Sequence, residues 1–121
     1  MKPIIAAVAC LALGACATWS PETRVEEGTF DALQVLDGLQ TANIAHTPGM
    51  HEAESAWAIG REPSARSAAA FMAAGAAAHF AVTAWMCSHH APEWAVRTWE
   101  LTSIGWSAHD VGVNFALGIK P

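Results

Sequence analysis

Charged and apolar positions come in blocks along this chain, and one long block without formal charge runs from Ser67 to Cys87. A membrane-spanning helix needs about 20 mostly apolar residues, which this block supplies, chiefly as alanine. Small residues recur in it every four positions, a spacing that lets helices approach closely in lipid. They are Ala69, Ala73, Ala77 and Ala81, with Ala70, Ala74 and Ala78. The pattern predicts a membrane helix over about 65–87, and the alternative is the buried central helix of a soluble bundle.

A second helix is predicted over about 93–117, after a turn that ends in Pro92. Its polar residues follow one another at spacings of three and four and form a narrow stripe: Arg97, Glu100, Ser103, Ser107, Asp110 and Asn114. A narrow polar stripe with a broad apolar side is typical of a helix surrounded by lipid. Arg97 and Glu100 are spaced to pair, and His79 and Thr83 form a matching polar face on the preceding helix.

A third helix is predicted over about 30–45, where Gln34, Asp37 and Thr41 form a polar stripe beside an apolar side. The fold class is therefore all-α, a small helical hairpin or three-helix membrane-associated bundle. One layout has three membrane spans with the Arg61 and Arg66 loop in the cytoplasm. In the competing layout the helix over 30–45 lies on the membrane surface.

The N-terminal residues have the features of a bacterial lipoprotein signal. Lys2 precedes a short apolar run, which ends in the lipobox Leu13-Gly14-Ala15-Cys16. The sequence thus predicts a signal peptide over 1–15 and acylation of Cys16, with palmitate among the chains that anchor it. Residues 16–28 are polar and acidic and are expected to form a tether, and residues 29–121 form the helical domain.

Composition narrows the classes of function. The chain is 53% hydrophobic and 14% charged, with a net charge of −5, so no basic surface for nucleic acid is expected. Cys10, Cys16 and Cys87 match no zinc or redox spacing, and no disulfide is expected. His51-Glu52 lacks the second histidine of a helical zinc motif, and no catalytic motif occurs, so no metal, cofactor or enzymatic activity is predicted.

Polar residues from the three helices and the loop over 46–64 are candidates for one buried cluster: Asp37, Thr41, Glu54, His79, Asp110 and Asn114. Carboxylate, imidazole and amide groups on facing helices are the usual materials of a site that binds a metal, a proton or a small ligand. The alternative is that these groups satisfy one another and hold the helices together.

Several short motifs are shared with one family. They are Asp37-x-x-Gln40-Thr41, Glu54, Gly60-x-x-Pro63-Ser64, His79, Ala91-Pro92, Arg97, and Asn114 with Gly118-Ile119-Lys120. With the lipobox, they resemble small lipoproteins or membrane proteins of tailed phages and prophages of Gram-negative bacteria. That family usually reads Glu-x-Asn-Pro in the central loop, where this chain has Glu54-Ser55-Ala56-Trp57. The resemblance implies a phage or prophage context and brings no established activity.

We therefore expect a non-enzymatic, lipid-anchored membrane protein that acts on the envelope, for example in superinfection exclusion. The alternative is the polar site described above. A lysis accessory such as a spanin is disfavoured because the segment over 17–28 is too short to bridge two membranes. The expected location is the bacterial cell membrane, the inner rather than the outer. The expected partners are membrane lipid through acylated Cys16, an envelope protein, and a second copy through the alanine-rich helix face.

Overall fold

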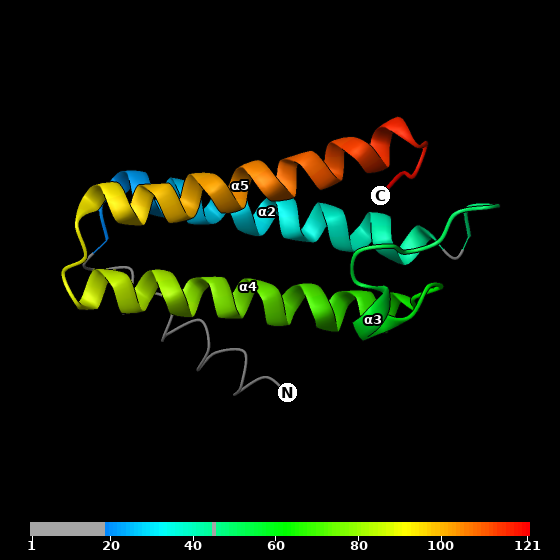
Figure 1. Ribbon diagram of the computed structural model, residues 1–121, viewed down its shortest axis with the longest axis horizontal. Helices are drawn as coiled ribbons and strands as arrows, with labels where there is room; N and C mark the ends of the chain where they lie inside the picture. The colour runs from blue at the N-terminus through cyan, green and yellow to red at the C-terminus, as the bar shows by residue number, and fades with distance from the viewer. Residues whose placement is uncertain (1–18, 45) are drawn as a thin grey trace.

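The computed structural model describes residues 19–44 and 46–121, and within them the chain is helical without any strand (Figure 1). Its helices are α2 (Pro21–Ile44), the short α3 (Ala56–Ile59), α4 (Ala65–Ser88) and α5 (Glu93–Ala116). The all-α prediction is confirmed for this part of the chain. The predicted signal peptide and the acylated Cys16 lie outside the described residues.

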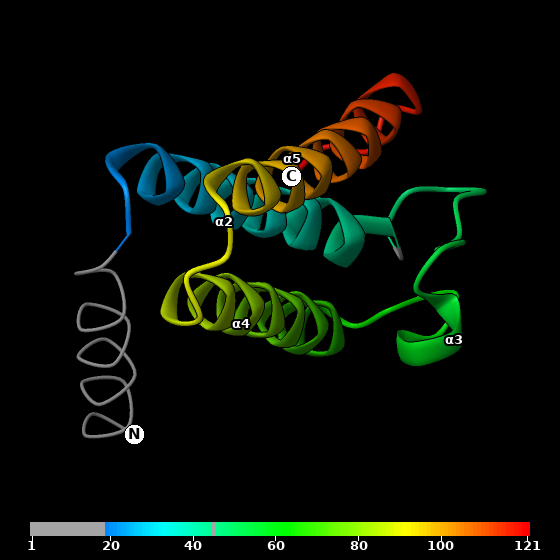
Figure 2. The same cartoon turned by 60° about the vertical axis from the view of Figure 1, so that its left-hand side comes forward.

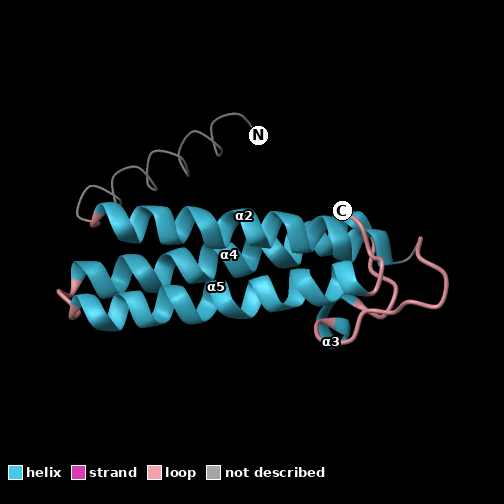
Figure 3. Cartoon of the chain, turned by 90° about the horizontal axis from the view of Figure 1, so that it is seen from above, coloured by secondary structure: helices cyan, strands magenta, loops and turns pink. Residues whose placement is uncertain are grey.

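The three long helices run side by side, with α4 antiparallel to α2 and α5 (Figures 1 and 3). α2 packs along both of the others, whereas α4 and α5 touch over little of their length (Figure 2). α2 is therefore the central helix. α4 is long and apolar enough to cross a membrane, and only 17% of its most apolar window is buried. A buried central helix, the soluble alternative for this segment, would be mostly covered by its neighbours.

Short-range signals explain where the helices begin and end. Ser64 caps α4, because its Oγ accepts a hydrogen bond from the backbone N–H of Ser67 at 3.1 Å. Pro92 precedes α5, where its fixed φ suits a helix start. After α5, Gly118 adopts a φ of 82°, which lets the chain turn back so that Ile119 is buried. The observed bounds of α4 and α5 lie within one residue of those predicted.

The first helix begins earlier than predicted. Ser20 Oγ accepts a hydrogen bond from the backbone N–H of Thr23 at 3.1 Å, and Pro21 and Glu22 occupy the first turn. Ser, Pro and Glu in this order suit the cap, first position and positive end of a helix. The expected tether over 16–28 is therefore helical from Pro21 onward. Glu26 and Glu27 are buried in this extension of the helix.

Polar side chains fill much of the interior. Within the described residues the largest fully buried side chains are Gln40, Glu100, Thr83 and Pro63. Buried apolar residues are comparatively few: Trp19, Phe30, Ile44, Ala68, Val96, Val111 and Ile119. Conversely, many large apolar residues are exposed: Val25, Val35, Leu39, Trp57, Val82, Trp85, Trp94, Leu101, Trp106, Val113, Phe115 and Leu117. The alanines that recur every four residues in α4 also face outward.

Candidate functional site

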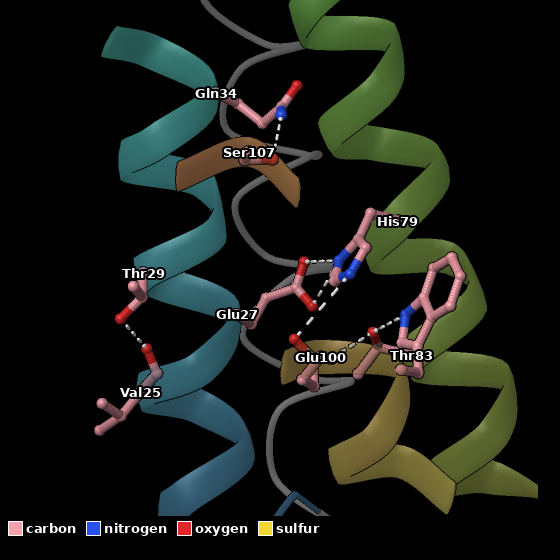
Figure 4. A network of polar contacts seen from close by, with 9 residues as sticks. Val25, Glu27, Thr29, Gln34, His79, Thr83, Glu100 and Ser107 are labelled. Atoms are coloured by element: carbon pink, nitrogen blue, oxygen red, sulfur yellow. Dashed lines mark hydrogen bonds and ion pairs between the residues drawn. The ribbon is translucent and has the colours of Figure 1, made fainter. Parts of the chain in front are cut away.

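One residue from each long helix contributes to a buried polar cluster. Glu27 of α2, His79 of α4 and Glu100 of α5 point toward one another (Figure 4). One ligand atom of each, a carboxylate oxygen or a ring nitrogen, lies within 4.8 Å of the others. The residues are 4%, 5% and 0% exposed, respectively. We call this set the Glu–His–Glu cluster.

The imidazole of His79 is held between two aromatic rings. Phe30 stacks on it with a centroid separation of 3.8 Å and an interplanar angle of 22°. Trp99 covers the other face at 4.8 Å and 17°. Because both faces are covered, the ring can make polar contacts only at its edge. There, Nδ1 lies 3.2 Å from both carboxylate oxygens of Glu27.

Glu100 is held on one side only. Thr83 donates a hydrogen bond from Oγ1 to Glu100 Oε1 at 2.6 Å, and Trp99 Nε1 donates to Thr83 Oγ1 at 3.2 Å. Glu100 Oε2 and His79 Nε2 face each other at 4.0 Å, which is too long for a hydrogen bond. Among the described residues neither atom has a hydrogen-bond partner. Two buried polar atoms are thus left without a partner and face a shared space.

Burial raises the pKa of Glu100 from its ordinary value of 4.5 to about 7. The hydrogen bond from Thr83 and the nearby His79 oppose this rise, and Glu27 adds to it both through its negative charge and through the direct approach of its carboxylate to that of Glu100. Arg97 does not relieve the charge, because its guanidinium forms an ion pair at 3.3 Å with Glu26 rather than with Glu100. The expected pairing of Arg97 with Glu100 is therefore corrected.

A groove between α4 and α5 reaches one member of the cluster, His79. It has a volume of about 470 Å³, and His79 and Phe30 lie among its lining residues. Most of the lining is apolar, including Val82, Trp99 and Trp106. The groove exists because α4 and α5 pack on α2 rather than on each other. A small solute or ion can therefore approach His79 from the surface.

Most of the residues predicted to form one cluster lie elsewhere. Asp37, Thr41, Glu54, Asp110 and Asn114 line a separate pocket of about 380 Å³, and His79 is absent from its lining. We call this the acidic pocket. Asn114 donates a hydrogen bond from Nδ2 to Asp37 Oδ1 at 3.0 Å, Thr41 is buried and Glu54 is exposed.

The carboxylates of the acidic pocket repel one another. Burial first, and then the charges of Asp110, Glu52 and Glu54, raise the pKa of Asp37 to about 6, against the hydrogen bond from Asn114. Burial and nearby carboxylates also raise the pKa values of Glu54 and Asp110. The six predicted residues are thus divided between two sites at different levels of the bundle.

The sequence alone did not identify Glu27 and Glu100 as the partners of His79. The acidic pattern over 16–28 predicts a tether that includes Glu27, whereas the start signal Ser20-Pro21-Glu22 places Glu27 more than one turn inside a helix. Glu100 was recognised in the polar stripe of its helix, and Thr83 of the matching face does contact it. Comparison of the chain with protein-family models, with curated proteins and with solved structures finds no significant match.

Proposed function

We propose that the protein is a non-enzymatic, lipid-anchored protein of the bacterial membrane that acts through contacts in the envelope. The observation that carries this proposal is the inverted distribution of side chains. Trp85, Trp94 and Trp106 are 60–72% exposed, while Glu100, Gln40 and Thr83 are fully buried. Soluble proteins rarely present so much large apolar surface without a partner or a membrane to cover it.

The charges on α2 orient the bundle in this proposal. Glu22, Arg24 and Asp31 are exposed on α2, which runs beside α4 for most of its length. If α4 crossed the bilayer, α2 would carry these charges into the hydrocarbon, which is unfavourable. The proposal therefore has the exposed sides of α4 and α5 against the membrane surface, with α2 facing water. Acyl chains on Cys16 would hold the bundle there.

Vesicle flotation tests this orientation without the lipid anchor. The Cys16→Ser protein is mixed with phosphatidylcholine vesicles, which carry no net charge, and floated in a density gradient. We expect it to rise with the vesicles, and we expect Leu101→Gln combined with Trp106→Gln to leave it at the bottom. Val25→Gln combined with Val35→Gln is the matched control, because these α2 residues are as exposed (69% and 64%) as Leu101 and Trp106 (51% and 67%).

Two outcomes would overturn the proposed orientation. In one, the control pair abolishes flotation as completely as the α5 pair does. In the other, the Cys16→Ser protein stays in the membrane pellet after carbonate extraction of cells, which would mean that the chain crosses the bilayer instead of lying on its surface. A Cys16→Ser protein that neither floats nor pellets would refute association through the bundle itself.

The resemblance to phage and prophage lipoproteins supports a role in superinfection exclusion. Expression of the full chain from a plasmid is expected to lower the plating efficiency of tailed phages on a Gram-negative host. Cys16→Ser is expected to raise plating toward that of cells without the chain, since only the exposed apolar sides of α4 and α5 would then hold the protein at the membrane. Equal plating with and without the full chain, across a panel of tailed phages, would refute this role.

A further inference from the structure

We propose that the Glu–His–Glu cluster binds one divalent transition-metal ion of the zinc type. In this site His79 Nε2 and the Glu100 carboxylate ligate the ion, and Glu27 fixes the imidazole through Nδ1. The inference does not depend on the proposed function, because it concerns the interior of the bundle and not its outer surface.

Two buried atoms of the cluster lack a hydrogen-bond partner among the described residues. His79 Nε2 and Glu100 Oε2 belong to side chains more than nine-tenths buried, and they face each other at 4.0 Å. If the cluster were only an internal ion triad, a protonated imidazole would bond both carboxylates at about 2.7–2.9 Å. Only the Nδ1 side approaches that arrangement, at 3.2 Å. The Nε2 side is instead open, by somewhat more than the separation of two ligands of one ion.

Coordination geometry supports the same conclusion. A tetrahedral zinc ion lies about 2.0–2.1 Å from a histidine nitrogen and from a carboxylate oxygen, so two such ligands are about 3.4 Å apart. The observed 4.0 Å needs to close by about 0.6 Å. Rotation of the Glu100 side chain supplies that movement, while the hydrogen bond from Thr83 keeps its other oxygen in place.

The residues around His79 are of the kind that orient metal-binding histidines in other proteins. Such a histidine almost always donates its second ring N–H to a carboxylate or carbonyl, which fixes the tautomer and the ring orientation. Glu27 occupies that position, and Phe30 and Trp99 hold the ring plane. Thr83 does the same for the carboxylate ligand. The groove between α4 and α5, which His79 lines, is the side from which an ion would enter.

Charge and donor type identify the class of ion. Two buried carboxylates and one neutral imidazole carry a charge of −2, which a divalent cation neutralises without protonating Glu100. Imidazole is a preferred ligand of zinc and its neighbours in the transition series, whereas magnesium and calcium favour oxygen ligands throughout. We therefore expect Zn²⁺ and Co²⁺ to bind here, and Mg²⁺ and Ca²⁺ not to bind here.

Calorimetric titration of the metal-free Cys16→Ser protein with ZnCl₂ tests the site. We expect one ion per chain, with affinity reduced at least tenfold in Glu100→Gln and by about 10- to 100-fold in Glu27→Gln. Glu100→Gln keeps the shape of the side chain, so loss of binding does not reflect loss of the fold. Titration with Co²⁺ gives a second readout, because its visible absorption reports ligation by nitrogen and oxygen.

The chain supplies matched controls. His89→Ala combined with His90→Ala removes two exposed histidines, and Asp37→Asn removes a carboxylate of the acidic pocket. Both proteins are expected to bind zinc like the parent. The proposal is overturned if the parent does not bind zinc at millimolar concentration, or if a control abolishes binding while Glu100→Gln retains it. Binding of Mg²⁺ that Glu100→Gln abolishes would also contradict the assigned class of ion.

Discussion

Replacing Glu100 by glutamine is expected to stabilise the metal-free protein at alkaline pH. The glutamine side chain keeps the shape of Glu100, and its carbonyl oxygen can still accept the hydrogen bond from Thr83 Oγ1. It removes a carboxylate that is fully buried near a second carboxylate, Glu27. The change therefore isolates the free energy of holding a negative charge at this position.

The magnitude follows from the pKa of Glu100. One pKa unit corresponds to about 1.4 kcal/mol, so a pKa of about 7 in place of 4.5 makes ionised Glu100 about 3 kcal/mol less favourable in the folded state. Below pH 4.5 the group is protonated in both states and this loss is absent. It grows as the pH rises and is complete above about pH 7. Local relaxation and water penetration lower such penalties. We therefore expect the free energy of unfolding of Glu100→Gln to exceed that of its parent by roughly 1 to 3 kcal/mol at pH 8 and by almost nothing at pH 5.

Guanidinium unfolding of the Cys16→Ser protein, followed by circular dichroism in EDTA, measures the effect at pH 5, 6, 7 and 8. Glu22→Gln is the control, because Glu22 is exposed on the same bundle and surface changes usually stay within about 0.5 kcal/mol. The reasoning is refuted if Glu100→Gln is less stable than its parent at pH 8. It is also refuted if the difference between the two proteins is the same at pH 5 and pH 8.

Three further substitutions test the polar interior. Asp37→Asn should raise the free energy of unfolding by roughly 1 to 2 kcal/mol above pH 6 and leave it unchanged at pH 4, as measured by thermal melting. The reason is that burial and the charge of Asp110 raise the pKa of this partly exposed carboxyl to about 6, and asparagine carries no charge that the fold must accommodate. Thr83→Ala should lower the free energy of unfolding, measured in denaturant, by about 1 to 3 kcal/mol, because Glu100 loses its hydrogen bond. Thr83→Ser keeps the hydroxyl and should retain most of that stability. Gln40→Ala should lower the free energy of unfolding, measured in denaturant, by about 2 kcal/mol or more, because Gln40 Nε2 donates to the carbonyls of Val111 and Ile119. An unchanged unfolding midpoint would contradict that role.

The helices were largely predictable because their ends carry local signals. Ser64 and Pro92 mark the starts of α4 and α5, and the polar stripe of α5 does face the interior through Glu100 and Ser107. The start of α2 was missed because its acidic first turns look like a solvated tether. Burial of Glu27 there depends on packing against His79, a contact 52 residues distant that no local pattern encodes.

The division of the site into two could not be predicted for a related reason. Periodicity shows which residues share a face of one helix, but it does not fix the vertical register between antiparallel helices. His79 lies at the level of Glu27 and Phe30, whereas Asp37 lies at the level of Asn114. Glu54 belongs to a loop, so its approach to the acidic pocket depends on the path of that loop over residues 46–64.

The polar interior also sets the thermal behaviour of the bundle. Heat capacity rises on unfolding mainly because apolar surface becomes hydrated, and exposure of polar surface lowers it. With Gln40, Thr83 and Glu100 buried and many large apolar side chains already at the surface, unfolding in water hydrates little new apolar area. The curve of stability against temperature should therefore be unusually flat. A flat curve implies a broad calorimetric transition and little tendency to cold denaturation.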